Sequence, residues 1–141
     1  MSDTVQFDLV SPERLLASVQ ANSVQIPGSE GNLTALPGHM PLITTLRPGI
    51  LTISSSEGDQ QFLVTGGFAE VGEMVTVLAE KAVPRADITQ EEYDNMVADA
   101  ESFYNQAQDN FVSEPGPVDE AAKMLSDMVA VGGEIGLNAS R

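Results

Sequence analysis

The chain has 141 residues, no cysteine and one histidine, and its 21 acidic and 6 basic residues give a net charge of −15. The lack of cysteine excludes disulfide bonds and thiolate zinc sites, and a field of this sign opposes binding to nucleic acid and to anionic lipid. No run of 18 apolar residues occurs, so we expect no membrane-spanning helix. The opening MSDTVQFDLV has neither a basic region nor an apolar core, so we expect no signal peptide.

The first part of the chain, up to residue 86, has apolar residues at every second position. In GILTIS, Leu51 and Ile53 fall on one face, QFLVT repeats the alternation, and MVTVLAE places Val75, Val77 and Ala79 together. Turn-forming residues separate these runs, at Ser11-Pro12, Pro27-Gly28, Glu57-Gly58-Asp59 and Gly72-Glu73. Short strands at this spacing predict an N-terminal antiparallel β-sandwich over residues 1–86.

Residues 87–141 follow a helical period instead. Thr89 and Glu92 have the spacing of a capping box. A first apolar stripe then falls at Tyr93, Met96, Val97, Ala100, Phe103, Tyr104, Ala107 and Phe111, and a second at Val118, Ala121, Ala122, Leu125, Met128 and Val129. Residues 113–117 separate the stripes, and Gly132-Gly133 is expected to end the second helix. The pattern predicts a C-terminal two-helix antiparallel hairpin with a frayed end over residues 136–141.

Charge is distributed unevenly between these two parts. Residues 1–86 carry 9 acidic and 4 basic residues, a net charge of −5, whereas residues 87–141 carry 12 acidic and 2 basic residues, a net charge of −10. The helical carboxylates do not match a calcium-binding loop and mostly fall away from the apolar stripes. We interpret them as a solvated helix face. The sequence thus predicts a mainly β protein with a helical appendage.

Residues that could carry chemistry are few. His39 stands in Gly38-His39-Met40-Pro41, which has no nucleophile elbow, and a single histidine without cysteine is too few for a metal site built from several histidines. The segment PGSEG at 27–31 looks superficially like a phosphate loop, yet it lacks the lysine that a phosphate loop needs and its Glu30 would repel a phosphate. We therefore expect no catalytic residue, no metal and no cofactor.

Composition and pattern alone favour an interaction or structural subunit over an enzyme. One alternative is a small hydrolase that uses His39 with a serine, which would show turnover by the isolated chain. Another is a ligand-binding β-sandwich. That alternative is disfavoured because the first half has only three aromatic residues and no tryptophan or tyrosine, the three being Phe7, Phe62 and Phe68.

Four motifs in residues 5–83 give a more specific indication. They are Glu30-Gly31, Pro37-Gly38-His39 with Pro41-Leu42, Arg47-Pro48-Gly49, and Gly66-Gly67-Phe68 with Glu70-Val71. In this order they resemble the epsilon subunit family of the F-type ATP synthase. The layout of that family, a β-sandwich followed by two helices, agrees with the two parts predicted from periodicity.

The resemblance implies a non-catalytic subunit of the rotor. Members of this family bind the gamma subunit and the ring of c subunits, and they help to couple proton passage to rotation and ATP synthesis. The implied place is the cytoplasmic face of the bacterial inner membrane, as a peripheral subunit. The C-terminal helices are expected to meet the alpha and beta subunits transiently.

The resemblance also points to individual residues. The loop Gly28, Ser29, Glu30 and Gly31 matches the segment that faces the polar loops of the c ring, and Glu30 is expected to set register there. Asn32 stands where many members have a second glutamate, which weakens a purely ionic account of that contact. The next turn is expected near gamma and the ring, and comprises Pro37, Gly38, His39, Met40, Pro41 and Leu42.

The helical part departs from inhibitory members of the family. Residues 87–122 contain no lysine or arginine, and the only basic residues after residue 86 are Lys123 and Arg141. Like charges oppose docking on acidic segments of the beta subunit. The arginine-containing pattern that some members use to bind ATP between the helices is also missing. We therefore expect weak or absent inhibition of ATP hydrolysis and no tight ATP site.

Overall fold

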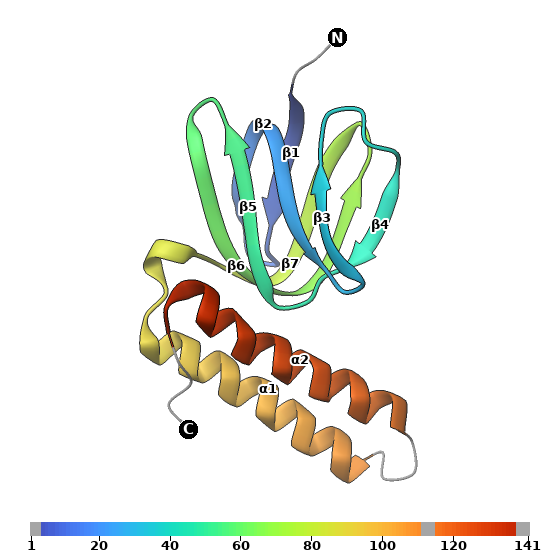
Figure 1. Ribbon diagram of the computed structural model, residues 1–141, viewed down its shortest axis with the longest axis vertical. Coiled ribbons are helices and arrows are strands. Elements are labelled where there is room, and N and C mark those ends of the chain that lie inside the picture. The colour runs from blue at the N-terminus through green and yellow to red at the C-terminus, as the bar shows by residue number, and fades with distance from the viewer. Residues whose placement is uncertain (1–3, 111–114, 138–141) are drawn as a thin grey trace. The chain divides into compact units, whose positions relative to one another are not determined.

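The computed structural model describes residues 4–110 and 115–137, and the chain forms two compact units, Met1–Arg85 and Ala86–Arg141. Figure 1 shows strands in the first unit and helices in the second. The elements are β1 (Val5–Val10), β2 (Leu15–Gly28), β3 (Gly31–Ala35), β4 (Leu42–Thr45), β5 (Gly49–Ser55), β6 (Gly58–Val71), β7 (Met74–Pro84), the 3-10 turn η1 (Arg85–Asp87), α1 (Gln90–Asn110) and α2 (Pro115–Ile135).

The seven strands form one sheet that closes on itself. Their order is β1-β7-β6-β5-β2-β3, β1 also pairs with β2, and β4 pairs with β6. The β1–β2 pairing closes the row, so in Figure 1 the strands surround a common interior. This arrangement is the predicted β-sandwich, and its closure leaves few strand edges open to other chains.

Alternate residues of the strands fill the interior. Leu51 and Ile53 of β5 and Val75 and Val77 of β7 are fully buried, whereas Leu78 is exposed on the outer face. The faces predicted from GILTIS and MVTVLAE are therefore confirmed. The buried cluster draws on every strand except β4, and it includes Phe7, Leu9, Val24, Ile26, Ala35, Phe62 and Val64.

The strand β6 changes partners at its glycine pair. Before the pair it is bonded to β5, after it to β4, and β7 runs beside both parts. Gly67 has a φ of 97°, and a Cβ on it would lie 1.9 Å from the backbone oxygen of Leu78. Any side chain at position 67 would push β6 away from β7. This close approach is the physical reason for glycine in the GGF motif.

One strand pairing differs from the prediction of an all-antiparallel sandwich. β1 and β7 are parallel, with Gln6 opposite Met74 and Val10 opposite Leu78. Five strands rather than a short turn connect these two, so no hairpin fixes their relative direction. The other named pairings are antiparallel, as expected.

The connections gather at two ends of the sandwich, which we name the Glu30 end and the Met40 end. The Glu30 end holds the connections at 11–14, 29–30 and 46–48, and the Met40 end holds those at 36–41, 56–57 and 72–73. The strand β4 spans the two. Its last residue, Thr45, accepts a hydrogen bond from Ser29 N at 2.9 Å, while its first residue, Leu42, pairs with Val71 beside the turn at 72–73.

The second unit is the predicted antiparallel helical hairpin. Thr89 caps α1, because its side-chain oxygen accepts from Glu92 N at 3.1 Å and its carbonyl accepts from Tyr93 N at 3.0 Å. Phe103 is 49% exposed although it belongs to the predicted stripe, and Phe111 lies outside the described residues. The buried members of the α1 stripe are Tyr93, Met96, Val97, Ala100 and Ala107.

In α2 the stripe is displaced toward the C-terminus. Ala121 and Met128 are buried as predicted, but Val129 is 46% exposed and Val131, which was not predicted, is buried.

Within residues 4–110 and 115–137, no helix is long and apolar enough to cross a membrane.

The predicted boundaries of α2 are wrong at both ends. The helix does not stop at Gly132-Gly133 but continues to Ile135. Gly136 then ends it with a φ of 77°, and Leu137 N donates back to Gly132 O at 2.8 Å, so residues 136 and 137 form a cap. The rest of the predicted frayed end, 138–141, lies outside the described residues. At its start, α2 takes in Pro115, since proline fits a first turn whose N–H groups lack helical acceptors.

Candidate partner-binding site

The Ser29-Glu30 turn is a tight hairpin tip. It joins β2 to β3, with Gly28 opposite Gly31 in the last pair of the ladder. Gly31 has a φ of 140°, a conformation that glycine adopts without strain. Glu30 is exposed, as are Gly31 and Asn32, whereas Gly28 is buried. The fold therefore presents one carboxylate at the tip of a short, tightly paired turn.

Neighbouring segments hold this turn in place. Ser29 Oγ lies 2.6 Å from Thr45 Oγ1, and Arg47 N donates to Pro27 O at 3.0 Å. The guanidinium of Arg47 adds two bonds: its Nε donates to Gly28 O at 3.1 Å and its Nη2 donates to Asn32 Oδ1. Asn32 thus accepts from a residue of this same chain. Arg47 belonged to a recognised motif, but its role as an anchor of the turn was not predicted.

The loop at 36–41 is a second, different tip. His39 N donates to Leu36 O at 3.0 Å and closes a turn around Pro37 and Gly38. His39 Nδ1 donates to Met40 O at 2.6 Å, so the ring is held by the backbone of its own loop. Met40 is 79% exposed. Leu36 and Leu42, 50% and 40% exposed, flank it along the chain, so the loop displays several apolar side chains rather than one isolated methionine.

The sequence placed these two tips next to each other, but the fold separates them. β3 lies between them, with the Ser29-Glu30 turn at its first residue and the 36–41 loop after its last. The first tip therefore belongs to the Glu30 end and the second to the Met40 end. A single flat partner surface cannot meet both.

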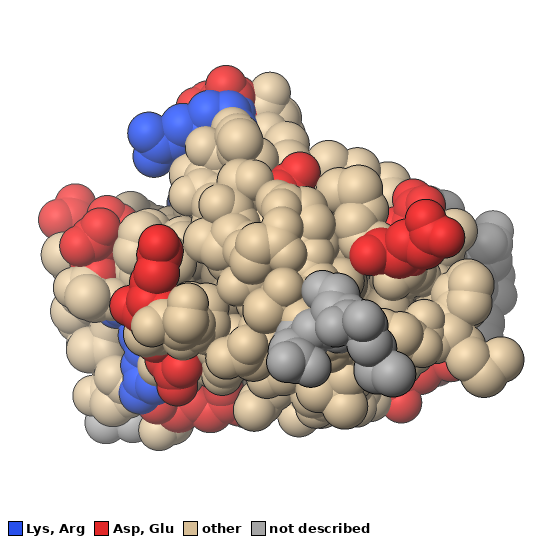
Figure 2. All heavy atoms as spheres, turned by 90° about the horizontal axis from the view of Figure 1, so that it is seen from above, with Lys and Arg blue, Asp and Glu red and all other residues tan. Residues whose placement is uncertain are grey.

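The two ends also differ in charge. All four basic residues of the sandwich lie in elements at or near the Glu30 end: Arg14, Arg47, Lys81 and Arg85. At the Met40 end, every Asp, Glu, Lys or Arg residue among those described is acidic, namely Glu57, Asp59, Glu70 and Glu73. Figure 2 looks onto the Met40 end and shows red Asp and Glu groups set apart by uncharged surface, with the blue atoms toward the edge of the view.

An apolar strip crosses the outer face of β4, β6 and β7. Ile43 is 69% exposed and Phe68 and Leu78 are both about 40% exposed. Phe68 and Leu78 stand directly opposite each other in the β6–β7 ladder, and Ile43 pairs with Glu70, two residues from Phe68 on the same face. We call these three residues the Phe68 strip. The period-two pattern places all three facing outward, but their joining into one strip depends on strand pairing.

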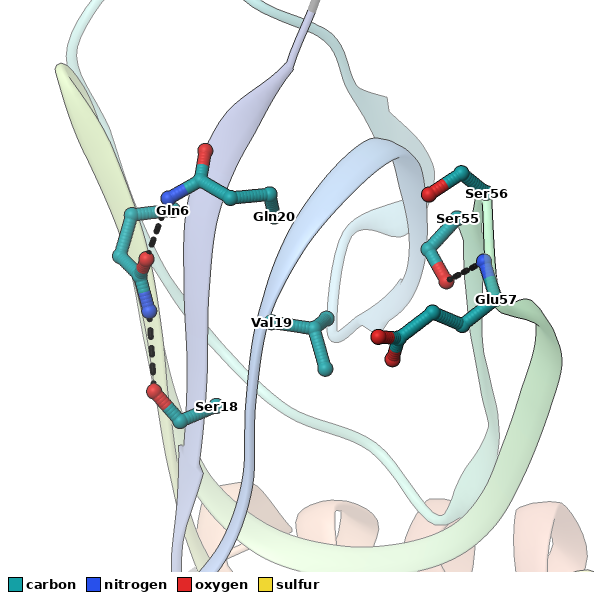
Figure 3. Close-up of a pocket in the computed structure, with 7 residues that line it drawn as sticks. All are labelled: Gln6, Ser18, Val19, Gln20, Ser55, Ser56 and Glu57. Carbon is teal, nitrogen blue, oxygen red and sulfur yellow. Dashed lines mark hydrogen bonds between the residues drawn. The ribbon is translucent and has the colours of Figure 1, made fainter.

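A polar hollow of about 290 Å³ lies beside β1, β2 and the turn after β5 (Figure 3). Its polar side chains bond to one another: Gln20 donates to Gln6 at 2.6 Å, and Gln6 donates to Ser18 at 2.9 Å. Across the hollow, Glu57 N donates to Ser55 Oγ at 3.3 Å. The two bonds of Gln6 join β1 to β2, so we interpret the hollow as part of the sheet closure rather than as a ligand site.

No group of three or more His, Cys, Asp or Glu side chains suited to a metal ion occurs in the described part of the chain. The His39 ring is bonded to the backbone carbonyl of Met40 in its own loop. The residues singled out from the sequence therefore form two separate exposed tips.

Comparison with known proteins identifies the family. The family model "ATP synthase, Delta/Epsilon chain, beta-sandwich domain" matches residues 4–85. The ATP synthase epsilon chain of Ruegeria sp. (strain TM1040) is 53% identical over 138 residues, which cover 97% of this chain and 100% of the relative. The ATP synthase epsilon chain of Rhodobacter capsulatus is 54% identical with the same coverage.

The fold is also that of a solved structure. A chain in the cryo-EM structure of the Euglena gracilis mitochondrial ATP synthase, OSCP/F1/c-ring in rotational state 1, aligns with a TM-score of 0.70 at 20% identity, covering 96% of this chain and 83% of that chain. On the sequence evidence, the chain belongs to the family of ATP synthase epsilon chains.

Proposed function

We propose that the chain is a non-catalytic adaptor that links the gamma subunit to the ring of c subunits and so couples proton flow to ATP synthesis. The observation that carries this proposal is the presence of two exposed, dissimilar tips at opposite ends of one closed sheet. A densely packed interior has low compressibility, so a load applied at one end is transmitted to the other. An adaptor between two moving partners needs this property.

The Glu30 end is assigned to the c ring. Its tip is braced by the β2–β3 ladder, by Thr45 and by Arg47, so little conformational freedom is lost when a partner binds. An exposed ion pair of Glu30 would contribute only about 0–1 kcal/mol. Glu30 therefore sets register, and affinity comes from packed area around the tip.

The Met40 end is assigned to gamma. Its loop displays Met40, and the Phe68 strip runs along the sheet toward the same end through β4. The charge there is acidic, which favours a basic partner surface, and the exposed Met40 adds an apolar contact. Pro37 and Pro41 stiffen the backbone that carries Met40, and Gly38 supplies the positive φ, 81°, that the turn between them requires.

Cysteine cross-linking in the assembled complex tests both assignments. The chain has no cysteine, so Glu30→Cys and Met40→Cys each introduce a unique thiol. We expect Glu30→Cys to capture the c subunit and Met40→Cys to capture gamma, and each variant is the control for the other. Capture of one subunit by both thiols would overturn the assignment. Failure of the purified chain to associate with gamma or the ring would overturn the adaptor role.

A hydrolase that uses His39 is the alternative that a simple assay separates from the adaptor. It requires turnover by the isolated chain that His39→Ala abolishes. The adaptor proposal expects no turnover above background for either protein, because the His39 ring is bonded to the Met40 carbonyl within its own loop.

The helical unit is proposed to be at most a weak regulator. Residues 87–122 contain no basic residue, which opposes docking on acidic segments of the alpha–beta head and removes the cations that would hold ATP. Contact with the head would be transient.

We place the chain as a peripheral subunit at the cytoplasmic face of the bacterial inner membrane, bound there through its protein partners rather than by insertion into lipid.

Deletion of residues 87–141 tests this reading of the helical unit. The ATPase activity of the assembled enzyme should change by less than about twofold, which corresponds to about 0.4 kcal/mol. A rise of several-fold on deletion would show that the hairpin inhibits. Equal assembly of the full-length and truncated chains is the required control.

A further inference from the structure

A buried tyrosine reaches from one helix of the hairpin to the other. Tyr93 lies in the first turn of α1, and its side chain is fully buried. Its hydroxyl lies 2.9 Å from Val129 O and 3.1 Å from Met128 O, both backbone oxygens of α2. A helical carbonyl has a second lone pair, so it can accept from this hydroxyl besides its own helical N–H.

A glycine on α2 makes room for the phenol. A Cβ on Gly132 would lie 2.3 Å from Tyr93 Oη and 2.4 Å from Leu137 O, so neither contact would survive a side chain there. Glycine inside a helix is unfavourable relative to alanine. The phenol therefore gives a reason for glycine at position 132, within the pair that looked like a helix stop in the sequence.

The position of this contact in the hairpin gives it a consequence. Because α2 follows α1 directly in the chain, the end of α1 and the start of α2 are held together by the chain itself. At the other end, the Tyr93 hydroxyl meets α2 at Met128 and Val129, nearly two turns before the helix finishes at Ile135. The phenol also lies against Gly132, whose carbonyl accepts from Leu137 N in the cap. The open end of the hairpin is thus fastened by a hydrogen bond between the helices.

We propose that Tyr93 and Gly132 form a latch that keeps the open end of the hairpin closed, so that separation of α1 from α2 begins with release of this hydroxyl. The latch is a conformational device of the helical unit. It involves only residues of this chain, so it stands whether or not the gamma and c-ring assignments hold.

Native-state hydrogen exchange of the full chain, followed residue by residue by NMR, tests the latch. Tyr93→Phe keeps the ring and removes only the hydroxyl. A typical lost hydrogen bond corresponds to about a fivefold change in a local opening equilibrium, so amides of residues 132–135 should exchange about fivefold faster. Amides of residues 118–122, far from the latch along α2, should keep their rates.

Tyr104→Phe is the matched control, since Tyr104 is the only other tyrosine and its hydroxyl accepts from Gln108 within α1 at 2.9 Å. It should leave residues 132–135 unchanged. Equal exchange in the Tyr93→Phe and Tyr104→Phe variants would overturn the latch. So would a uniform acceleration along both helices in Tyr93→Phe, which would mean general loss of stability rather than local opening.

A double-mutant cycle gives a second test that does not depend on a single variant. Gly132→Ala should speed exchange of residues 132–135 more in the wild-type background than in the Tyr93→Phe background, because the clash with the hydroxyl exists only in the first. The same acceleration in both backgrounds would show that the hydroxyl adds nothing to the contacts of Gly132 with the Tyr93 ring and with Leu137, and it would contradict the latch. If Gly132→Ala does not fold in either background, the exchange of Tyr93→Phe decides alone.

Discussion

The sandwich and the hairpin bury their apolar residues by different means. In the sandwich, side chains from nearly every strand meet in one closed interior, and most of the large ones are fully buried. In the hairpin, each helix buries one stripe, and Phe103, Met124 and Val129 are exposed. The sandwich is therefore fixed by many mutually supporting contacts, whereas the hairpin depends on fewer. Substitutions in the two units should differ accordingly in their effect on stability.

The largest effect is expected in the closed interior. Phe7→Ala removes a fully buried ring from β1 and should lower the free energy of unfolding by about 3–5 kcal/mol. Phe103→Ala in α1 is the control, because its side chain is half exposed, and it should lower stability by less than about 1 kcal/mol. Urea denaturation of both variants measures the difference. Similar losses would contradict the contrast between the units.

A slightly smaller effect is expected where β6 passes closest to β7. Gly67→Ala places a methyl group 1.9 Å from a backbone oxygen at a φ of 97°, so we expect a loss of about 3 kcal/mol. Gly58→Ala is matched, since Gly58 also has a positive φ, 110°, but its Cβ would meet nothing within 4 Å. It should lose about 1–2 kcal/mol through backbone strain alone. Equal losses would mean that the close strand contact is unimportant.

Much of this architecture could be predicted, because it follows from the spacing of apolar and capping residues along short segments of the chain. The alternation in GILTIS and MVTVLAE predicts which side chains face the interior, and the Thr89 cap predicts where α1 begins. Such patterns fail where glycine can serve two purposes, either to end a helix or to leave room for a neighbouring side chain. Gly132-Gly133 has the composition of a helix stop, yet one of the pair instead makes room for Tyr93, a residue 39 positions earlier. Only the register of the two helices reveals that contact.

The candidate site was predicted in its residues but not in its geometry. The motifs identified both tips, and the spacing made them look like neighbouring turns. The five residues of β3 between them place them at opposite ends of the sandwich. The parallel pairing of β1 with β7, the Phe68 strip and the bonds of Arg47 to Gly28 and Asn32 arise from contacts between distant segments, for which a single sequence carries no signal.

A moderate effect is expected at the Glu30 tip. The side chain of Arg47 holds this turn through two hydrogen bonds, much as the side chain of Tyr93 holds the hairpin. Arg47→Ala removes the donors to Gly28 O and Asn32 Oδ1 and should lower stability by about 1–2 kcal/mol. Arg14→Ala changes the charge equally from an exposed position and should cost less than about 0.5 kcal/mol. Amide exchange at residues 28–32 should rise only in Arg47→Ala. An unchanged turn in that variant would show that Thr45 and the ladder suffice.

The smallest effect concerns the pH dependence of the hairpin. Burial raises the pKa of Tyr93 above 10.0, a hydrogen bond from the Gly132 backbone partly opposes this, and the charge of Asp94 adds to it. The folded chain then holds the phenolic proton more tightly than the unfolded chain. Its contribution to stability is complete below pH 10 and declines as the pH rises from there toward the folded pKa.

The comparison of wild type with Tyr93→Phe isolates this contribution, since every other group that titrates in alkali is common to both proteins. The difference in their unfolding free energies, measured by urea denaturation at pH 8 and again above pH 10, should shrink as the pH rises, because the unfolded wild type ionises at Tyr93 more readily than the folded wild type, whereas Tyr93→Phe has no phenolic proton to lose. A difference that stays constant across this range would mean that the hydroxyl ionises equally well in the folded and unfolded chains. The fastening of the hairpin would then not depend on a buried, protonated phenol.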